Sequence, residues 1–278
     1  MKPLANINVV SLAINVPGPV AAAELRDLGA TVCKVEPPSG DPLAQFSKAW
    51  YDRLCADMAV VSLDLKSDEG MADLRTRLQS ADLLLTASRP AALERLGLGP
   101  ERLCAAYPRL CQVGIIGYPH PHENEAGHDL TYQASMGTLQ PPDLPRVLLA
   151  DMAGAQDAVT AALALLFARE RTGVAGHQWV ALSGAAERFA VTVREGITTS
   201  GGILGNGLPS YNLYATEDGY IALAALEPHF HQRLLEALGV ESVTEAQLAA
   251  HFRSGDNVAW RAWADAHAIP LAVVSELG

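Results

Sequence analysis

The stretch INVVSLAINVPGPVAAAELRDLGATVCKVE, residues 7–36, decides the fold of this chain. It contains an apolar run at 7–14, an alanine-rich segment at 18–30 and a second apolar run at 31–36. Proline favours the first turn of a helix and glycine its end, so we expect residues 18–30 to form a helix between two strands. A strand–helix–strand unit of this kind implies two parallel strands joined by a right-handed crossover.

The same alternation continues along the next 160 or so residues, by the spacing of apolar and turn segments. Ser67 is expected to cap one of the helices. Strands are predicted at 59–65, 82–87, 109–116 and 177–184. Helices are predicted at 67–81, 91–99, 148–173 and 185–199. A strand-like run at 147–150 leads into the helix at 148–173. This pattern predicts an α/β fold with a Rossmann-like open parallel sheet. The first strand is not followed by GxGxxG, so a dinucleotide site is weakly supported.

A second, smaller domain is expected after the glycine-rich segment SGGILGNGLPS, residues 200–210, which has no periodicity and resembles a linker. Beyond it the pattern indicates a hairpin at 211–226 with an Asp218–Gly219 turn. Two helices, at 227–239 and 258–268, and a final strand at 269–274 are expected after the hairpin. We therefore predict a large domain over 1–197, which would bind the ligand, and a linker with a small α+β domain over 198–278.

The composition limits the class of protein. Of the 278 residues, 49% are hydrophobic and 18% are charged, as in a globular protein with a sizeable core. No uncharged apolar window of about 18 residues is present, so no membrane span is predicted. The four cysteines show no CxxC spacing and are expected to be reduced thiols of a cytoplasmic protein. A net charge of -11 argues against nucleic acid as a partner.

Four polar residues follow predicted strands and are candidates for a site: His128, Asp129, Asp151 and Glu227. The carboxyl ends of strands in α/β sheets line the ligand crevice. Each residue also has a plain structural alternative. Asp151 is suited to be a helix N-cap, Glu227 a first-turn acid, His128 a solvated loop residue and Asp129 a cap for the segment that follows it. No GxSxG elbow and no metal-ligand spacing occurs, so no metal is expected.

A resemblance to a known family extends over nearly the whole chain. It is carried by GPVAAAELRDLGATVCKVEPPSGDP (18–42), SLDLKSDEG (62–70), ADLLLTASRPAALERLGLGPERL (81–103), PRLCQVGIIGY (108–118), AGHDLTYQASMG (126–137), LLADMAGAQ (148–156), RTGVAGHQWV (171–180) and LPSYNLYATEDGYIALAALEPHF (208–230). With these motifs the chain resembles the class III coenzyme A transferases, the CaiB/BaiF family. The segment AGHD followed by a tyrosine is similar to the branch of α-methylacyl-CoA racemases.

The resemblance implies an enzyme that takes a coenzyme A thioester as substrate and holds no permanently bound cofactor. It implies His128 as a catalytic base, Glu227 beside it, and Asp151 as the opposite acid or, in transferases, the nucleophile. A backbone N–H near Met152 or Ala153 is expected to support the oxyanion. Family members form interlocked dimers, so a homodimer is expected. The residues that the resemblance assigns to binding of coenzyme A are Leu63, Asp64, Leu65, Lys66, Arg89, Gly127, Asp129 and Tyr132.

Three functions remain open at this point. The first is an acyl-CoA racemase or epimerase that moves a proton at the α-carbon of a 2-methylacyl-CoA-like thioester through an enolate. The second is a CoA transferase that moves CoA between carboxylic acids through an aspartyl-CoA intermediate. The third is a non-catalytic or repurposed homologue, suggested by Pro37 where an arginine is usual. Family members are also expected to continue with a tail that returns to the first domain and that this sequence does not include.

Overall fold

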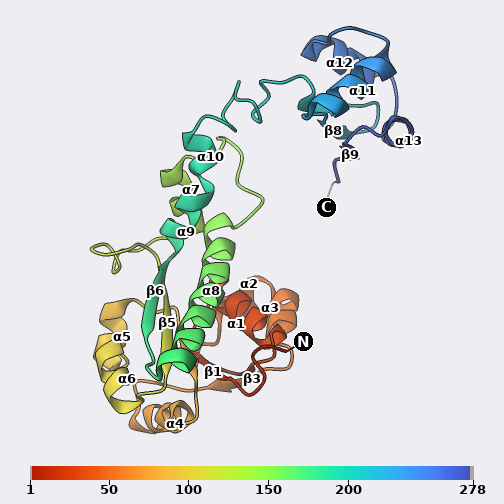
Figure 1. Cartoon of the computed structure of the whole chain (residues 1–278). Coiled ribbons are helices and arrows are strands. Elements are labelled where there is room, and N and C mark those ends of the chain that lie inside the picture. Colours follow the sequence, from red (N-terminus) through yellow and green to blue (C-terminus); the bar gives the residue numbers. More distant parts are fainter. Residues whose placement is uncertain (1, 276–278) are drawn as a thin grey trace. The chain divides into compact units, whose positions relative to one another are not determined.

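The computed structural model describes residues 2–275 of the chain (Figure 1). Met1 and residues 276–278, the outer ends of the two predicted domains, lie outside the described residues. The chain forms two compact units, Met1–Ala190 and Val191–Gly278. They divide a few residues before the predicted boundary, where the single helix expected over 185–199 is broken at Ala190. The residues that follow Ala190 include a β-branched run, which weakens a continuous helix.

The first unit is built on a six-stranded parallel sheet with the order β3-β2-β1-β4-β5-β6. The strands are β1 (Asn8–Ser11), β2 (Thr31–Glu36), β3 (Ala59–Ser62), β4 (Leu83–Thr86), β5 (Cys111–Ile116) and β6 (His177–Ala181). This order confirms the predicted Rossmann-like sheet. The chain passes from one half of the sheet to the other between β1 and β4, which are hydrogen-bonded neighbours.

Nine helices of the first unit connect these strands or follow them among the described residues. They are α1 (Pro17–Asp27), α2 (Pro42–Phe46), α3 (Lys48–Cys55), α4 (Asp68–Leu78), α5 (Pro90–Leu96), α6 (Pro100–Ala106), α7 (Asp129–Met136), α8 (Leu149–Thr172) and α9 (Leu182–Phe189). The predicted cap is confirmed, because the hydroxyl of Ser67 accepts the N–H of Gly70 at 3.0 Å. The strand-like run expected at 147–150 was wrong: α8 begins at Leu149, and these apolar residues open the helix.

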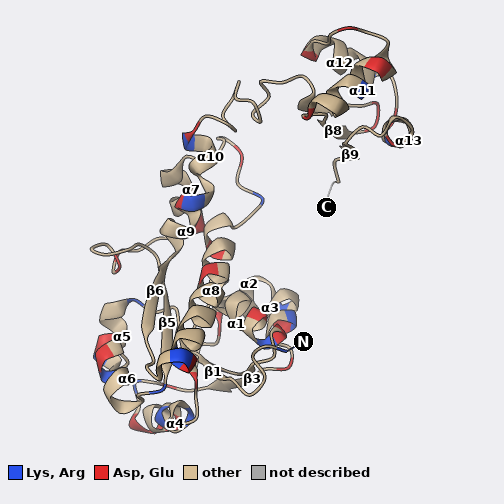
Figure 2. Ribbon diagram, viewed as in Figure 1, with Lys and Arg blue, Asp and Glu red and all other residues tan. Residues whose placement is uncertain are grey.

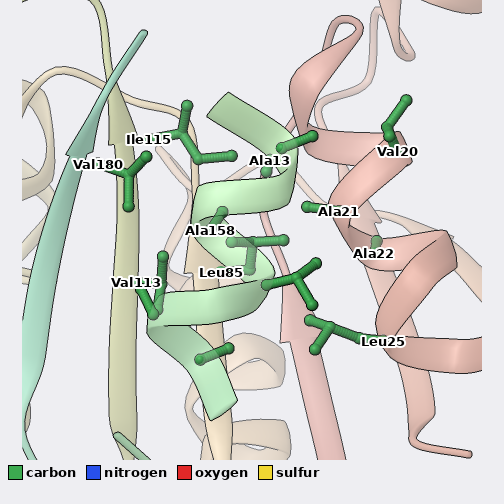
Figure 3. Packing of buried hydrophobic residues seen from close by; sticks show 14 of the residues in the cluster. Ala13, Val20, Ala21, Ala22, Leu25, Leu85, Val113, Ile115, Ala158 and Val180 are labelled. Atoms are coloured by element: carbon green, nitrogen blue, oxygen red, sulfur yellow. The ribbon is translucent and has the colours of Figure 1, made fainter. Parts of the chain in front are cut away.

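The main core lies where α8 packs against α1 on one side and the sheet on the other (Figure 3). Figure 3 shows Ala21 and Ala22 of α1 facing α8, while Val113 and Ile115 of β5 and Val180 of β6 lie on its opposite side. Small side chains at the contact let the two helix backbones approach closely, and the branched residues of the strands fill the remaining space. The first turn of α8 is thereby held against the sheet.

By length and composition, α8 alone among the described helices could cross a membrane. Half of its most apolar window is buried inside the unit, as in the core helix of a folded domain. It also carries the buried Arg169, which pairs with Asp82 at 3.0 Å and donates to the carbonyl of Arg109 at 2.8 Å. These contacts tie the last turns of α8 to the amino ends of β4 and β5. Figure 2 shows acidic and basic positions interspersed along the described helices.

The second unit contains a three-stranded antiparallel sheet, β7-β8-β9, and confirms the predicted α+β class. Its elements are α10 (Val191–Arg194), β7 (Tyr211–Ala215), β8 (Tyr220–Ala224), α11 (Pro228–Leu238), α12 (Glu245–Phe252), α13 (Asn257–His267) and β9 (Leu271–Val273). The predicted hairpin turn is present, with the N–H of Thr216 donated to the carbonyl of Gly219 at 2.9 Å. Helix α12 was missed, although Thr244 and Gln247 form a capping box at its start.

Candidate active site

A cavity of about 550 Å³ opens at the carboxyl ends of β1, β4 and β5 in the first unit. It is lined by Ile14, Asn15, Val16, Pro17, Leu43, Phe46, Ala87, Arg89, Ile115, Ile116, Gly117, Glu125, Ala126, Gly127, His128, Tyr132, Asp151 and Leu182. The strand order reverses between β1 and β4, and open α/β sheets bind their ligands outside the strand ends at such a point. The cavity is therefore the candidate site.

Five of the predicted residues meet in this cavity: Arg89, Gly127, His128, Tyr132 and Asp151. They come from three connections that are far apart in the sequence, the ends of β4 and β5 and the start of α8. The Rossmann-like order brings these connections to one edge of the sheet. The structure thus brings two of the three expected catalytic residues and three of the eight expected binding residues to one cavity.

His128 is the N-cap residue of α7. Its backbone N–H is donated to the hydroxyl of Thr131 at 3.0 Å, and that hydroxyl donates back to the carbonyl of His128 at 2.8 Å. These bonds hold the backbone of His128. Its side chain takes part in the capping box at the start of α7, and the residue lines the cavity. A histidine side chain at the cavity wall can accept or donate a proton there.

Asp151 lies in the first turn of α8, three residues after the N-cap residue Leu148, so its expected N-cap role was wrong. Its carboxyl group accepts no hydrogen bond from the part of the chain that the structure describes, and it lines the cavity. Burial, and then the negative charge of Asp129, raise the pKa of Asp151 to about 7. A carboxyl group that titrates near neutrality can serve as an acid or as a base.

Asp129 orders the start of α8 instead of facing the cavity. One carboxylate oxygen accepts the N–H of Ala150 at 2.7 Å and that of Asp151 at 3.0 Å. The other accepts the side-chain amide of Gln133 at 2.6 Å. Asp129 is buried and caps α8, not its own helix α7, which corrects the expected capping. We assign it a positioning role for Asp151, and its contact with CoA stays a prediction.

The amide of Met152 is also engaged, because it is donated to the carbonyl of Leu148 at 2.9 Å. The amide of Ala153, one residue further along, falls in the regular hydrogen-bond ladder of α8. The expectation that one of these two N–H groups supports an oxyanion was therefore wrong. A hydrogen-bond donor for such an oxygen must come from another part of the cavity.

Tyr132 packs between two glycines of the cavity wall. A Cβ atom on Gly127 would come within 2.4 Å of the ring of Tyr132, and one on Gly117 within 2.4 Å of its hydroxyl oxygen. Only residues without a side chain leave room for this ring. The ring of Tyr118 meets that of Tyr132 edge to face, with centroids 5.0 Å apart. The glycine of AGHD thus has a steric reason to precede the histidine.

The predicted segment Leu63–Lys66 is not part of the cavity lining. It follows β3, an outer strand of the sheet, whereas the cavity lies at β1, β4 and β5. Leu63 and Leu65 pack on the apolar cluster under α4, Asp64 accepts the N–H of Lys66 at 3.0 Å, and the side chain of Lys66 is exposed. Contact of this segment with CoA stays a prediction.

Glu227 belongs to the second unit, where it is the N-cap residue of α11. Its backbone carbonyl accepts the N–H groups of Phe230 and His231, at 3.0 and 2.9 Å. The predicted pairing of its carboxylate with His128 stays a prediction.

A buried charge cluster beside the cavity was missed at the sequence level. Lys34 of β2 is fully buried and contacts Glu36 at 2.5 Å and Asp41 at 2.7 Å. The second oxygen of Asp41 accepts the N–H groups of Asn15 and Leu43, both at 3.0 Å. Two walls of the cavity are thereby joined. A lysine in an apolar strand with two acids nearby was the available signal, since lysine is seldom fully buried unless it is paired.

Replacing Asp129 by asparagine is expected to lower the pKa of Asp151, which should remain above 3.8 because burial is the larger cause of its shift. The amide oxygen can still accept the two N–H groups at the start of α8, while the amide nitrogen cannot accept the side-chain amide of Gln133. The start of α8 is thus kept while the charge beside Asp151 is removed. A carboxyl-carbon NMR titration measures the pKa directly. Asp143→Asn, in an exposed loop, is the control. An unchanged pKa in Asp129→Asn would contradict the electrostatic coupling.

Comparison with known proteins agrees with the fold. The family model of CoA-transferase family III matches residues 4–270. Human alpha-methylacyl-CoA racemase is 33% identical over 259 residues, which cover 86% of this chain and 65% of that protein. Succinyl-CoA--D-citramalate CoA-transferase of Chloroflexus aurantiacus is 29% identical over 287 residues, 93% of this chain and 70% of the relative. The chain thus spans just under two thirds of the length of the human racemase.

Solved structures show the same fold. A hypothetical protein from Mycobacterium tuberculosis, 27% identical, superposes with a TM-score of 0.85 over 99% of this chain and 86% of the other. A CaiB/BaiF family protein from Brucella suis, 23% identical, has a TM-score of 0.82, covering 99% and 85% of the two chains. The family match extends over nearly all of the sequence and includes every residue that lines the cavity. The chain belongs to CoA-transferase family III.

Proposed function

We propose that this protein is an acyl-CoA racemase or epimerase that acts at the α-carbon of a 2-methylacyl-CoA-like thioester. The observation that carries the proposal is the pair His128 and Asp151 in one cavity, where the carboxyl group of Asp151 accepts no hydrogen bond from the described residues. Burial and the charge of Asp129 raise the pKa of Asp151 to about 7, so this carboxyl group can hold a proton near neutral pH. An acid and a base in one cavity can exchange one proton through a substrate in either direction.

The reaction needs two acid–base groups because it inverts a carbon centre. The proton α to a thioester carbonyl is weakly acidic, so a placed base must remove it while a donor holds the developing enolate oxygen. One group takes the α-proton, the electron pair moves into the enolate, and the other group protonates the opposite face. For one enantiomer the base is neutral His128 and the acid is protonated Asp151; for the other enantiomer the roles are reversed.

The coenzyme A part of the substrate is proposed to lie along Arg89, the basic residue among those lining the described cavity. A guanidinium forms charge-assisted hydrogen bonds to phosphate or carbonyl oxygens. The chemistry is carried by the thioester and the two side chains, with no permanently bound cofactor. We further propose that the protein is a homodimer in the cytoplasm. Glu227 is proposed to support His128. Sedimentation of the purified protein tests whether it is a dimer.

A CoA transferase is the second candidate, favoured by the unbonded carboxyl group of Asp151 in the cavity. A carboxylate oxygen of Asp151 would attack the acyl carbonyl and expel CoA thiolate, which leaves a mixed anhydride. The thiolate would then attack the Asp151 carbonyl, release the first acid and form an aspartyl-CoA thioester. A second acid would take up CoA by the reverse steps. His128 has no required part in this route.

Incubation with 2-methylacyl-CoA in heavy water separates the two reactions. A racemase incorporates one deuterium at the α-carbon, which mass spectrometry detects as a gain of about one mass unit. Transfer of CoA to an added free acid without deuterium uptake, together with an adduct at Asp151 that hydroxylamine cleaves, would assign the transferase reaction instead. No binding of CoA thioesters in calorimetric titration up to millimolar concentration would leave the non-catalytic homologue.

A further inference from the structure

The hydroxyl group of Tyr132 is an unused hydrogen-bond donor in the wall of the cavity. The residue is almost fully buried, yet it lines the cavity, and its hydroxyl has no hydrogen-bond partner within residues 2–275. Its oxygen lies close to the Cα positions of Gly117 and Gly127, where any side chain would displace it. A polar group in a cavity wall that has no protein partner is completed by water or by a ligand.

The ring has little freedom to find a partner elsewhere. It is clamped by the two glycines and by Tyr118, whose ring meets it at an interplanar angle of 81°. It stands one turn after His128 in α7, so the same short helix presents the imidazole and the phenol to the cavity. The charges of Asp151 and Arg89 both influence the phenol, which places it among the groups that would surround the thioester.

The reaction creates a negative oxygen in this cavity, and the backbone amides nearest to Asp151 are engaged. Those of Ala150 and Asp151 bond to Asp129, and that of Met152 bonds to Leu148. A pre-oriented donor in a site shielded from water stabilises a developing oxyanion far more than it would in solution. The phenol of Tyr132 meets these conditions.

We propose that the Tyr132 hydroxyl donates a hydrogen bond to the thioester carbonyl oxygen and, more strongly, to the enolate oxygen formed from it. The hydrogen bond to the enolate oxygen rests on the proposed function. The hydrogen bond to the thioester carbonyl rests on the cavity alone. The phenol does not transfer its proton. Burial, followed by the charges of Tyr118 and Asp151, raises the pKa of Tyr132 to about 12, so the group stays a donor throughout the neutral range.

Tyr132→Phe removes one oxygen atom and leaves the ring packing intact, and Tyr118→Phe is the matched control on the neighbouring ring. Binding is measured by calorimetry with two ligands, a 2-methylacyl-CoA and the thioether in which its carbonyl is replaced by CH₂. The wild type and Tyr118→Phe should prefer the thioester by about tenfold, the value of one hydrogen bond. Tyr132→Phe should bind both ligands equally. An unchanged preference in Tyr132→Phe would overturn the proposal.

The kinetic arm uses the rate of α-deuterium incorporation. Tyr132→Phe should lower kcat by about 10²-fold with little change in KM, since the bond strengthens in the transition state. If the wild type shows no exchange, the racemase function fails, while the thioester preference still decides the role of Tyr132.

Arg89→Ala is included because its guanidinium also lines the cavity. Loss of the preference in Arg89→Ala, but not in Tyr132→Phe, would assign the carbonyl contact to Arg89 and overturn the proposal.

Discussion

Replacement of Asp151 by asparagine is expected to reduce kcat by 10²–10⁴-fold, about the contribution of one acid–base group, and at the same time to stabilise the fold. An amide has the shape of the carboxyl group but neither transfers a proton at neutral pH nor forms the aspartyl-CoA adduct. The loss of activity follows under both candidate reactions. The gain in stability follows from the raised pKa of Asp151 in the folded protein.

The pH dependence of this stability gain can be derived from the pKa values. The pKa of Asp151 is about 7 in the folded protein and 3.8 without perturbation. Between these values the folded state binds more protons than the unfolded state, so ionisation of Asp151 progressively opposes folding as pH rises. The penalty is absent below about pH 4 and complete above about pH 7. Asparagine removes it, which should stabilise the variant by roughly 2–4 kcal/mol at pH 8.

Urea denaturation of wild type and Asp151→Asn at pH 4.5 and pH 8 measures this effect. The difference in the free energy of unfolding should be small at the lower pH and reach its full size at the higher one. Glu125→Gln, another carboxyl change in the cavity lining, is the control and should show no comparable increase. An Asp151→Asn variant that is less stable than wild type at pH 8 would show that the carboxylate is held favourably by its surroundings.

Replacement of Lys34 by methionine is expected to destabilise the first unit by about 3–5 kcal/mol, the range for removing one partner of a buried ion pair. Lys34 is 0% exposed, and its loss leaves Glu36 and Asp41 buried without their cation. The effect should also reach the cavity, because Asp41 holds the amides of Asn15 and Leu43 in its walls. Weaker binding of CoA thioesters should accompany the loss of stability.

Lys48→Met is the matched control for this prediction. Lys48 also contacts a carboxylate, that of Asp52 at 2.7 Å, but its side chain is 76% exposed. Exposed pairs contribute about 0–1 kcal/mol, so the urea midpoint should barely move. In a further variant, Lys34→Met is combined with Glu36→Gln and Asp41→Asn to neutralise the whole cluster, and part of the lost stability should return. Equal effects of Lys34→Met and Lys48→Met would contradict the argument.

Much of the architecture follows from local sequence patterns. The alternation of apolar runs with helical segments predicts the parallel sheet, because each strand and each helix is encoded within a short window. Turn residues such as Ser67 and the Asp218–Gly219 pair mark element ends for the same reason. The placement of His128 beyond β5 also follows, since the carboxyl ends of parallel strands share one edge of the sheet. Asp151 reaches the same edge at the start of α8, not at the end of the strand-like run expected before it. Helices α2, α3, α6 and α12 were missed, because short segments carry too little periodicity.

The chemical properties of the site depended on the tertiary structure. Asp129 caps a helix that begins about twenty residues later in the chain, and this contact fixes the amides at the start of α8 and helps to raise the pKa of Asp151. The burial of Lys34 and the unpartnered hydroxyl of Tyr132 likewise depend on neighbours from other elements. Sequence by itself determined the strands of the sheet and the connections that follow them, because these are a matter of local periodicity. Only packing between distant segments decided their solvation, hydrogen bonds and proton affinity, because these are set by what surrounds each group in space.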